Sequence, residues 1–325
     1  MKSLRWLIVL LILFLSVSLT GCELFRRNKD TDVSLIMDTE KLEDIELRET
    51  VLYYRDDKGI IIPVMRRIPW NEGIGRVAIN LLIDEPGLRD DLALVGLLPV
   101  LPAGTEVMGI SIDEGLAKVD FNENILSYET EIDEKVIVQS LVYTLTEFEA
   151  IDKVQLLVDG KNIKKLTYGT KIKEPLQREN INLSAAIQDE EIPVVVYYKN
   201  TTNGRDSFFV PVTKGINTLK ADIKSTLASL VEGAPKDTGL YSELPAGVIL
   251  NDVYVKDGVA YIDFSEEIKN MPGNKVHQQS MIYELGFTLK EIEPTISRVR
   301  ILSNGKEIEL NPDVSLDLPT YLNAH

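Results

Sequence analysis

The sequence has few of the residues that most often carry chemistry. Its 325 residues include one cysteine and two histidines, one of which is the last residue, His325. A single cysteine excludes an internal disulfide framework and a zinc site built from cysteine pairs. Two histidines leave little material for metal ligation or for proton transfer near neutral pH. Enzyme classes that depend on these side chains are therefore disfavoured.

Positive charge is scarce as well. Lys and Arg number 35 against 51 Asp and Glu, which gives a net charge of −16 and a pI near 4.7. Such a chain offers no general attraction to nucleic acid, because phosphate binding needs a clustered cationic surface. Hydrophobic residues make up 44% of the chain, which is enough for a packed core. The length suggests two domains of about 150 residues each.

The N-terminus has the layout of a signal peptide. Lys2 and Arg5 precede an apolar run, residues 6–19, that is shorter than the roughly 20 residues needed to span a bilayer. Leu19-Thr20-Gly21-Cys22 follows and resembles a bacterial lipobox, in which the cysteine is acylated and becomes the new N-terminus. We expect residues 1–21 to be removed, which leaves a mature charge of −16 − 2 = −18. Attachment to the extracytoplasmic face of the cell membrane would then depend on acyl chains at Cys22, with residues 22–49 as a tether.

The rest of the sequence contains one domain twice. Leu101-Pro102-Ala103-Gly104, Gly115 and Asp120-Phe121 return at a constant offset of 143 as Leu244-Pro245-Ala246-Gly247, Gly258 and Asp263-Phe264. Further matches, at offsets from 140 to 148, are Tyr53-Tyr54 with Tyr197-Tyr198, Pro63-Val64 with Pro211-Val212, Gln139-Ser140 and Tyr143 with Gln279-Ser280 and Tyr283, and Gly160 with Gly305. A period this long indicates tandem domains rather than a solenoid. The predicted domains are residues 50–172 and 193–310, with a linker at 173–192 and a loosely packed tail at 311–325.

Each repeat has the pattern of an α+β domain with the order ββ-α-ββ-α-ββ. Paired strands separated by single helices favour a mostly antiparallel sheet with helices on one face. The predicted strands are 50–54, 60–65 and 154–158 in the first repeat, and 194–198, 208–212, 249–255, 259–264 and 299–302 in the second. The predicted helices are 74–83, ended by Pro86-Gly87, 133–148, 218–231 with Asn217 as N-cap, and 275–285.

Together these blocks resemble the GerM domain, which is found in bacterial lipoproteins of spore-forming lineages and is linked to sporulation and spore germination. The resemblance covers about residues 50–172 and 193–310. It implies a fold similar to the ring-building motifs of oligomerising proteins, and hence assembly with protein partners rather than catalysis. The second repeat departs from the pattern, since Lys214 stands where the first has Arg66. The residues that carry the repeat motif, all expected to be structural, are Arg66, Leu101, Pro102, Gly104, Gly115, Asp120, Phe121, Tyr143, Gly160, Leu244, Pro245, Gly247, Gly258, Asp263, Phe264, Tyr283 and Gly305.

Each candidate site has a plainer structural interpretation. The Leu-Pro-Ala-Gly blocks suit turns, and Asp120 and Asp263 suit capping of backbone N–H groups. The tyrosine pairs could form an aromatic platform for a glycan, but adjacent strand residues face opposite sides, so one of each pair is expected in the core. His277 is expected to be solvated.

The sequence therefore predicts a non-enzymatic protein with no catalytic residue, cofactor or metal. No Gly-x-Ser-x-Gly elbow or phosphate-binding Gly-x-x-x-x-Gly-Lys-Ser/Thr loop occurs. The leading hypothesis is a lipid-anchored scaffold or assembly factor in sporulation and germination, bound to protein partners and not to nucleic acid. The alternative is a solute- or glycan-binding envelope lipoprotein with a cleft between the repeats. An envelope hydrolase is a third, weaker hypothesis.

Overall fold

The structure is a computed structural model that describes residues 46–70 and 73–324. These residues form one compact unit. The predicted signal peptide, Cys22 and the tether up to residue 45 lie outside the described residues, as does His325. None of the helices in the described part is long and apolar enough to cross a bilayer.

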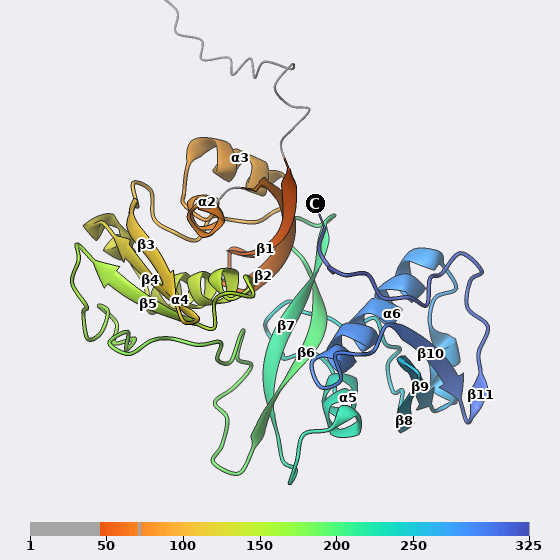
Figure 1. The fold of residues 1–325 in the computed structure, drawn as a ribbon. Helices are drawn as coiled ribbons and strands as arrows, with labels where there is room; N and C mark the ends of the chain where they lie inside the picture. Colours follow the sequence, from red (N-terminus) through yellow and green to blue (C-terminus); the bar gives the residue numbers. More distant parts are fainter. Residues whose placement is uncertain (1–45, 71–72, 325) are drawn as a thin grey trace, which may run out of the picture. The chain divides into compact units, whose positions relative to one another are not determined.

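The first repeat consists of a strand hairpin, a separate sheet and the helices between them (Figure 1). Its elements, in chain order, are β1 (Leu47–Arg55), β2 (Ile61–Pro69), α2 (Ile74–Asn80), α3 (Pro86–Leu94), β3 (Val107–Asp113), β4 (Leu116–Phe121), the 3₁₀ turn η2 (Glu123–Leu126), α4 (Glu131–Leu145) and β5 (Lys153–Val158). Helix α4 packs against both β1 and β5 and so joins the hairpin to the sheet.

The second repeat has the same plan. Its elements are β6 (Ile192–Thr201), β7 (Ser207–Ile216), α5 (Ile223–Val231), β8 (Leu250–Lys256), β9 (Val259–Phe264), the 3₁₀ turn η3 (Glu266–Asn270), α6 (Lys275–Lys290), β10 (Arg298–Ser303) and β11 (Lys306–Glu307). Strands β6 and β7 form the hairpin, and the sheet has the order β11-β10-β9-β8. The predicted tandem α+β fold is thus observed.

The sheets contain one parallel pair in each repeat. Strand β4 pairs in parallel with β5, and β9 pairs in parallel with β10, whereas the hairpins and the pairs β3-β4 and β8-β9 are antiparallel. The connections through α4 and α6 make this possible, because parallel neighbours need a long crossover rather than a tight turn. The closing hairpin predicted for each repeat is short in the second, β10-β11, and is a single bridge between Val158 and Lys161 in the first.

Several helix boundaries differ from prediction, among them the ends of 74–83, 133–148 and 275–285, and local capping decides two further starts. Pro86 was expected to end a helix but begins α3, where it occupies the first turn and needs no N–H donor. Helix α5 starts after Asp222, not Asn217, because the Asp222 carboxylate accepts from the Ser225 N–H at 2.7 Å and Ser225 Oγ accepts from the Asp222 N–H. The residues before Asp222 are left outside the helix, and Leu219 is fully exposed.

The segments after each repeat are part of the packed structure. The Val154 N–H donates to the Leu176 carbonyl at 2.9 Å, and in the second repeat the Val299 N–H donates to the Leu316 carbonyl at 3.0 Å. The prediction of a loosely packed tail is therefore wrong. Both segments return along the edge of their own sheet, because β5 and β10 would otherwise leave backbone groups unpaired.

The two hairpins meet through two asparagine side chains. Asn182 Oδ1 accepts from the Ile61 N–H of β2, and its Nδ2 donates to the carbonyls of Ile61 and of Pro211 in β7. Asn323 repeats this pattern with the strands exchanged: its Oδ1 accepts from the Phe209 N–H, and its Nδ2 donates to the carbonyls of Phe209 and Pro63. The hydrogen bonds lie between 2.7 and 2.9 Å. The contact has the symmetry of a two-fold axis between equivalent strands.

Candidate functional site

The Leu-Pro-Ala-Gly blocks form turns. The Thr105 N–H donates to the Pro102 carbonyl at 3.2 Å, and Gly104 has a φ of +75°, a value that L side chains rarely adopt. In the second repeat the Val248 N–H donates to the Pro245 carbonyl at 3.3 Å, and the φ of Gly247 is +77°. Leu101 is buried and Leu244 is half-buried at the start of each turn.

The other motif residues lie in hairpin turns and in the core. Asp120 Oδ1 accepts from the Gly160 N–H at 2.8 Å, and Asp263 Oδ1 accepts from the Gly305 N–H at the same distance. These contacts tie the turn that follows β5 or β10 to the neighbouring strand. Phe121 and Phe264 are fully buried, and Gly115 and Gly258 have φ values of +79° and +73° in the turns of the central hairpins. No catalytic arrangement forms around either aspartate within the described residues.

The tyrosine pairs hold each hairpin on its helix, with Tyr198 buried and Tyr197 half-buried in the second repeat. Tyr53 and Tyr54 are both buried, because α4 covers one face of β1 and the other face is also packed, so the first repeat offers no aromatic platform. The Tyr53 N–H donates to Thr144 Oγ1 at 3.1 Å and its hydroxyl donates to Glu147 at 2.8 Å. In the second repeat Tyr197 makes the same two contacts, to Thr288 at 3.0 Å and to Glu291 at 2.9 Å.

These contacts correct the sequence alignment of α4 with α6. The numbers of equivalent residues in the two helices differ by 144, so the structural counterpart of Tyr143 is Phe287 and not Tyr283. The aromatic contacts agree with this alignment. The ring centre of Tyr143 lies 5.2 Å from that of Tyr53, and the ring centre of Phe287 lies 6.0 Å from that of Tyr197, whereas Tyr283 lies against Phe209. The predicted pairing is wrong by four residues, about one helical turn, which leaves the buried face of a helix almost unchanged.

Arg66 and Lys214 do occupy equivalent positions. The Arg66 guanidinium lies 5.7 Å from the ring centre of Tyr54, and Lys214 Nζ lies 3.5 Å from the Tyr198 hydroxyl while donating to the Ser229 carbonyl at 2.6 Å. Burial raises the pKa of Tyr54 to about 12, although the Arg66 charge opposes the shift. The two cations therefore cover the same tyrosine position in their repeats and have a structural role.

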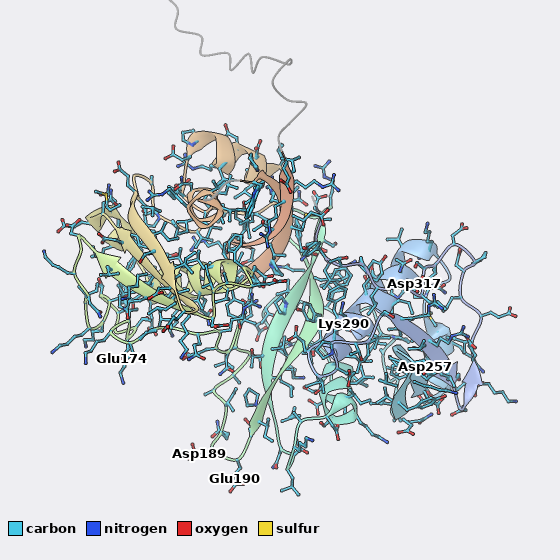
Figure 2. The ribbon with its side chains drawn as sticks, viewed as in Figure 1. Glu174, Asp189, Glu190, Asp257, Lys290 and Asp317 are labelled. Carbon is cyan, nitrogen blue, oxygen red and sulfur yellow. The ribbon has the colours of Figure 1, made fainter. Side chains whose placement is uncertain are left out.

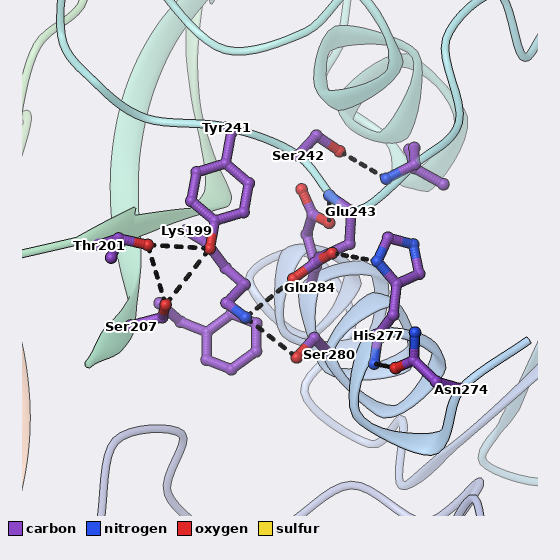
Figure 3. Close-up of polar contacts among 12 residues, drawn as sticks. Lys199, Thr201, Ser207, Tyr241, Ser242, Glu243, Asn274, His277, Ser280 and Glu284 are labelled. Carbon is purple, nitrogen blue, oxygen red and sulfur yellow. Dashed lines mark hydrogen bonds and ion pairs between the residues drawn. The ribbon is translucent and has the colours of Figure 1, made fainter. Parts of the chain in front are cut away.

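A buried polar cluster distinguishes the second repeat (Figure 3). Lys199 Nζ, on β6, donates to Glu243 at 2.8 Å and to Ser280 Oγ of α6 at 3.2 Å. His277 Nδ1 lies 2.6 Å from the other oxygen of Glu243, so its predicted solvated position is wrong. Glu284, which is fully buried, accepts from the Glu243 N–H at 2.8 Å. We call Lys199, Glu243, His277, Ser280 and Glu284 the buried cluster.

The first repeat keeps only the outer part of this arrangement. At the positions of Lys199 and His277 it has Arg55 and Asp133, which form an ion pair. At the position of Glu284, with the offset of 144, it has Ser140. The buried carboxylates are thus not required by the fold that both repeats share.

Burial governs the protonation of Glu284. Together with the charge of the neighbouring Glu243, it raises the pKa of this carboxyl to about 8. The hydrogen bonds from Ser242 and the Glu243 N–H, and the Lys199 charge, oppose the shift. A neutral carboxylic acid beside a lysine–glutamate–histidine chain can hold or pass a proton. Its groups, however, are mostly bonded to one another, as in a structural network.

Sequence patterns missed the buried cluster, although a signal was present. Glu284 lies in the apolar stripe of α6 between Met281 and Leu285, and Lys199 directly follows the buried Tyr198. Charges in positions that periodicity assigns to the core are expected to find partners. Periodicity names no partner for them, because Lys199, Glu243 and Glu284 come from three separate segments of the chain.

An open groove of about 900 Å³ lies between the repeats. It is lined by apolar residues such as Ile132 and Leu183 and by polar residues such as Gln139, Asn180 and Thr238. Gln139 is already engaged, because its Nε2 donates to the Asn180 carbonyl at 2.6 Å. The Gln139 amide nitrogen is therefore held by the protein itself rather than left for a ligand.

Comparison with known proteins identifies the family. The model of the Germane family, described as "Sporulation and spore germination", matches residues 51–164 and 195–309. The chain belongs to the Germane family. The resemblance to the GerM domain is thus confirmed, and the two matched segments coincide with the two repeats of the structure.

Relatives of this Germane chain share its tandem organisation. The spore germination protein GerM of Bacillus subtilis (strain 168) is 32% identical over 269 residues, which cover 80% of this chain and 72% of that protein. The solved structure of the tandem GerMN domains of the sporulation protein GerM from Bacillus subtilis superposes with a TM-score of 0.71 at 29% identity, covering 86% of this chain and 99% of that one. The predicted fold class, two tandem GerM-like repeats, is confirmed.

Proposed function

We propose that this Germane protein is a lipid-anchored, extracytoplasmic and non-enzymatic scaffold for a protein complex of the cell envelope in sporulation and spore germination. The observation that carries the proposal is the junction of the repeats. Asn182 and Asn323 bond to backbone groups of both β2 and β7, so the repeats are held as one body that presents fixed surfaces. The repeat-motif residues support it, because they are used in turns and in the core.

Anchoring is supported by the lipobox. Cys22 is the only cysteine and stands three residues after the apolar run 6–19. The variant Cys22→Ala should not be acylated, and the protein should leave the membrane fraction. Unchanged lipid labelling of the variant would contradict the anchor without affecting the scaffold.

The scaffold is tested by crosslinking in sporulating cells, with identification of the protein joined to this chain. A defined partner that is recovered with wild type, and lost when an exposed surface of one repeat is substituted, is the expected result. Turnover of peptidoglycan by the purified protein, abolished by replacing one carboxylate, would contradict a non-enzymatic role.

The groove between the repeats supports a second candidate, the binding of a solute or glycan. Its volume of about 900 Å³ is within the range of small-molecule sites. Thermal-shift measurements with cell-wall oligosaccharides test it. A shift that disappears in Ile132→Lys, whose side chain is exposed at the groove, would favour this function over the scaffold.

A further inference from the structure

Lysines are concentrated in one short part of this acidic chain. Residues 153–173 contain six lysines and one acidic residue, whereas residues 46–152 contain 21 acidic and nine basic residues. The segment comprises β5 and the loop that follows it, and its six lysines are all exposed. The charge of this segment is therefore opposite to that of the rest of its repeat.

Four of these lysines line one hollow of about 790 Å³, which we call the lysine hollow. They are Lys164, Lys165, Lys171 and Lys173, and the rest of the lining is the segment from Glu174, labelled in Figure 2, to Glu179. The loop that carries the lysines is fixed, since Leu166 and Ile172 are buried beneath it and Gln155 Nε2 donates to the Ile172 carbonyl at 2.9 Å. The lysines are thus held on one concave surface.

Most of the positive charge in the lysine hollow is not neutralised by ion pairs. Lys173 lies 3.3 Å from Glu174, but in the described part of the chain no ion pair involves Lys164, Lys165 or Lys171. Arg178, the only arginine of the lining, is held by Glu147 and by Thr146 Oγ1. The hollow therefore offers ammonium groups to a ligand rather than a guanidinium.

The second repeat shows that the fold does not need these lysines. Lys161 corresponds to Lys306 and Leu176 to Leu316, so Lys164 corresponds to Glu309 and Lys173 to Asp313. The loop there is five residues shorter, since the offset falls from 145 to 140, and it carries acidic residues at these two places. A function other than folding must account for the lysines of the first repeat.

We propose that the lysine hollow binds a linear chain of phosphate groups. Ammonium groups bind phosphate as point charges, without the planar pairing of a guanidinium, and the one arginine of the lining is occupied. The hollow also shares Lys171, Gln177 and Glu179 with the groove between the repeats, so an extended ligand can continue beyond it. A flat anionic membrane fits less well, because the lysines line a hollow rather than a flat surface.

The test uses the full chain in a non-ionic detergent with linear polyphosphate as the probe. Two quadruple variants of equal charge are compared. The hollow variant carries Lys164→Gln, Lys165→Gln, Lys171→Gln and Lys173→Gln. The control variant replaces four exposed lysines of the second repeat and carries Lys220→Gln, Lys256→Gln, Lys275→Gln and Lys306→Gln. We expect the hollow variant to bind about tenfold or more weakly and to lose most of its salt dependence, while the control binds like wild type.

Equal weakening of the two variants would overturn the proposal, since it would show attraction to overall charge. Equal affinity for polyglutamate would assign the hollow to an acidic protein instead. Binding to phosphatidylglycerol vesicles without binding to polyphosphate would assign it to the membrane. None of these results depends on the lipid anchor or on the scaffold.

Discussion

Asn182 and Asn323 occupy equivalent places after the two repeats, and each side-chain amide joins β2 to β7 with three hydrogen bonds. Neither strand pairs directly with the other, because the amides stand between the two edges. An edge strand with unpaired backbone groups invites association with other chains. These two side chains satisfy the edges internally and couple the repeats at the same time.

Replacing Asn323 with alanine should lower the free energy of unfolding by about 3 kcal/mol, because backbone groups of Pro63 and Phe209 lose their partners in a buried place. Urea unfolding followed by circular dichroism measures the loss. The double variant Asn182→Ala, Asn323→Ala should also split the transition into two, one for each repeat. The control Asn217→Ala, at an exposed position, should change the free energy by less than about 0.5 kcal/mol. A single sharp transition in the double variant would show that the amides do not couple the repeats.

Hydrophobic periodicity and turn-forming residues predicted the individual strands and hairpin turns of this fold. The strand 259–264 was predicted with its observed bounds, since Asp257-Gly258 fixes its start and alternation fixes its faces. The register between the helices was missed because Gln139 and Gln279 matched by identity, one turn from the structural pairing set by Thr144 and Thr288. The junction was missed because Asn182 and Asn323 act through backbone partners, which leave no pattern in the sequence.

Glu284 should make the stability of the second repeat depend on pH. Its pKa in the folded protein is about 8 against an ordinary value of 4.5, so above pH 4.5 the folded protein retains a proton that the unfolded chain releases. The free energy of unfolding should therefore fall as pH rises from about 5 to about 8, by up to about 1.4 kcal/mol per pH unit. Urea unfolding at several pH values measures this slope.

The variant Glu284→Gln removes the titrating group and keeps its shape. It should be more stable than wild type at pH 8, by about 2–4 kcal/mol, and the two should converge near pH 4.5. Glu309→Gln, at an exposed position, should retain the wild-type slope. An unchanged slope in Glu284→Gln would place the pH dependence elsewhere in the molecule.

Removing Lys199 from the second repeat should lower the free energy of unfolding more than removing its counterpart Arg55 from the first. Lys199→Met leaves Glu243 buried beside Glu284 without its lysine, and breaking such a pair costs about 3–5 kcal/mol. In the first repeat, Arg55→Met breaks the pair with Asp133, whose side chains are each 24% exposed, and should cost about 1 kcal/mol. Equal losses in urea unfolding would mean that burial does not set the strength of these pairs.

Gly96 should be intolerant of any side chain because the second repeat lies against it. Its φ is +71°, and an added Cβ would lie 2.8 Å from the backbone of Thr202, whose hydroxyl donates to the Val95 carbonyl. Gly204, in the turn between β6 and β7, has a similar φ of +79° but open space around it. Gly204→Ala should therefore cost about 1 kcal/mol for backbone strain alone, and Gly96→Ala about 3 kcal/mol, since a clash with backbone adds to the strain. The difference between the two losses of unfolding free energy, measured by urea unfolding, gives the cost of the clash between the two repeats. Equal losses would show that Thr202 moves away without penalty.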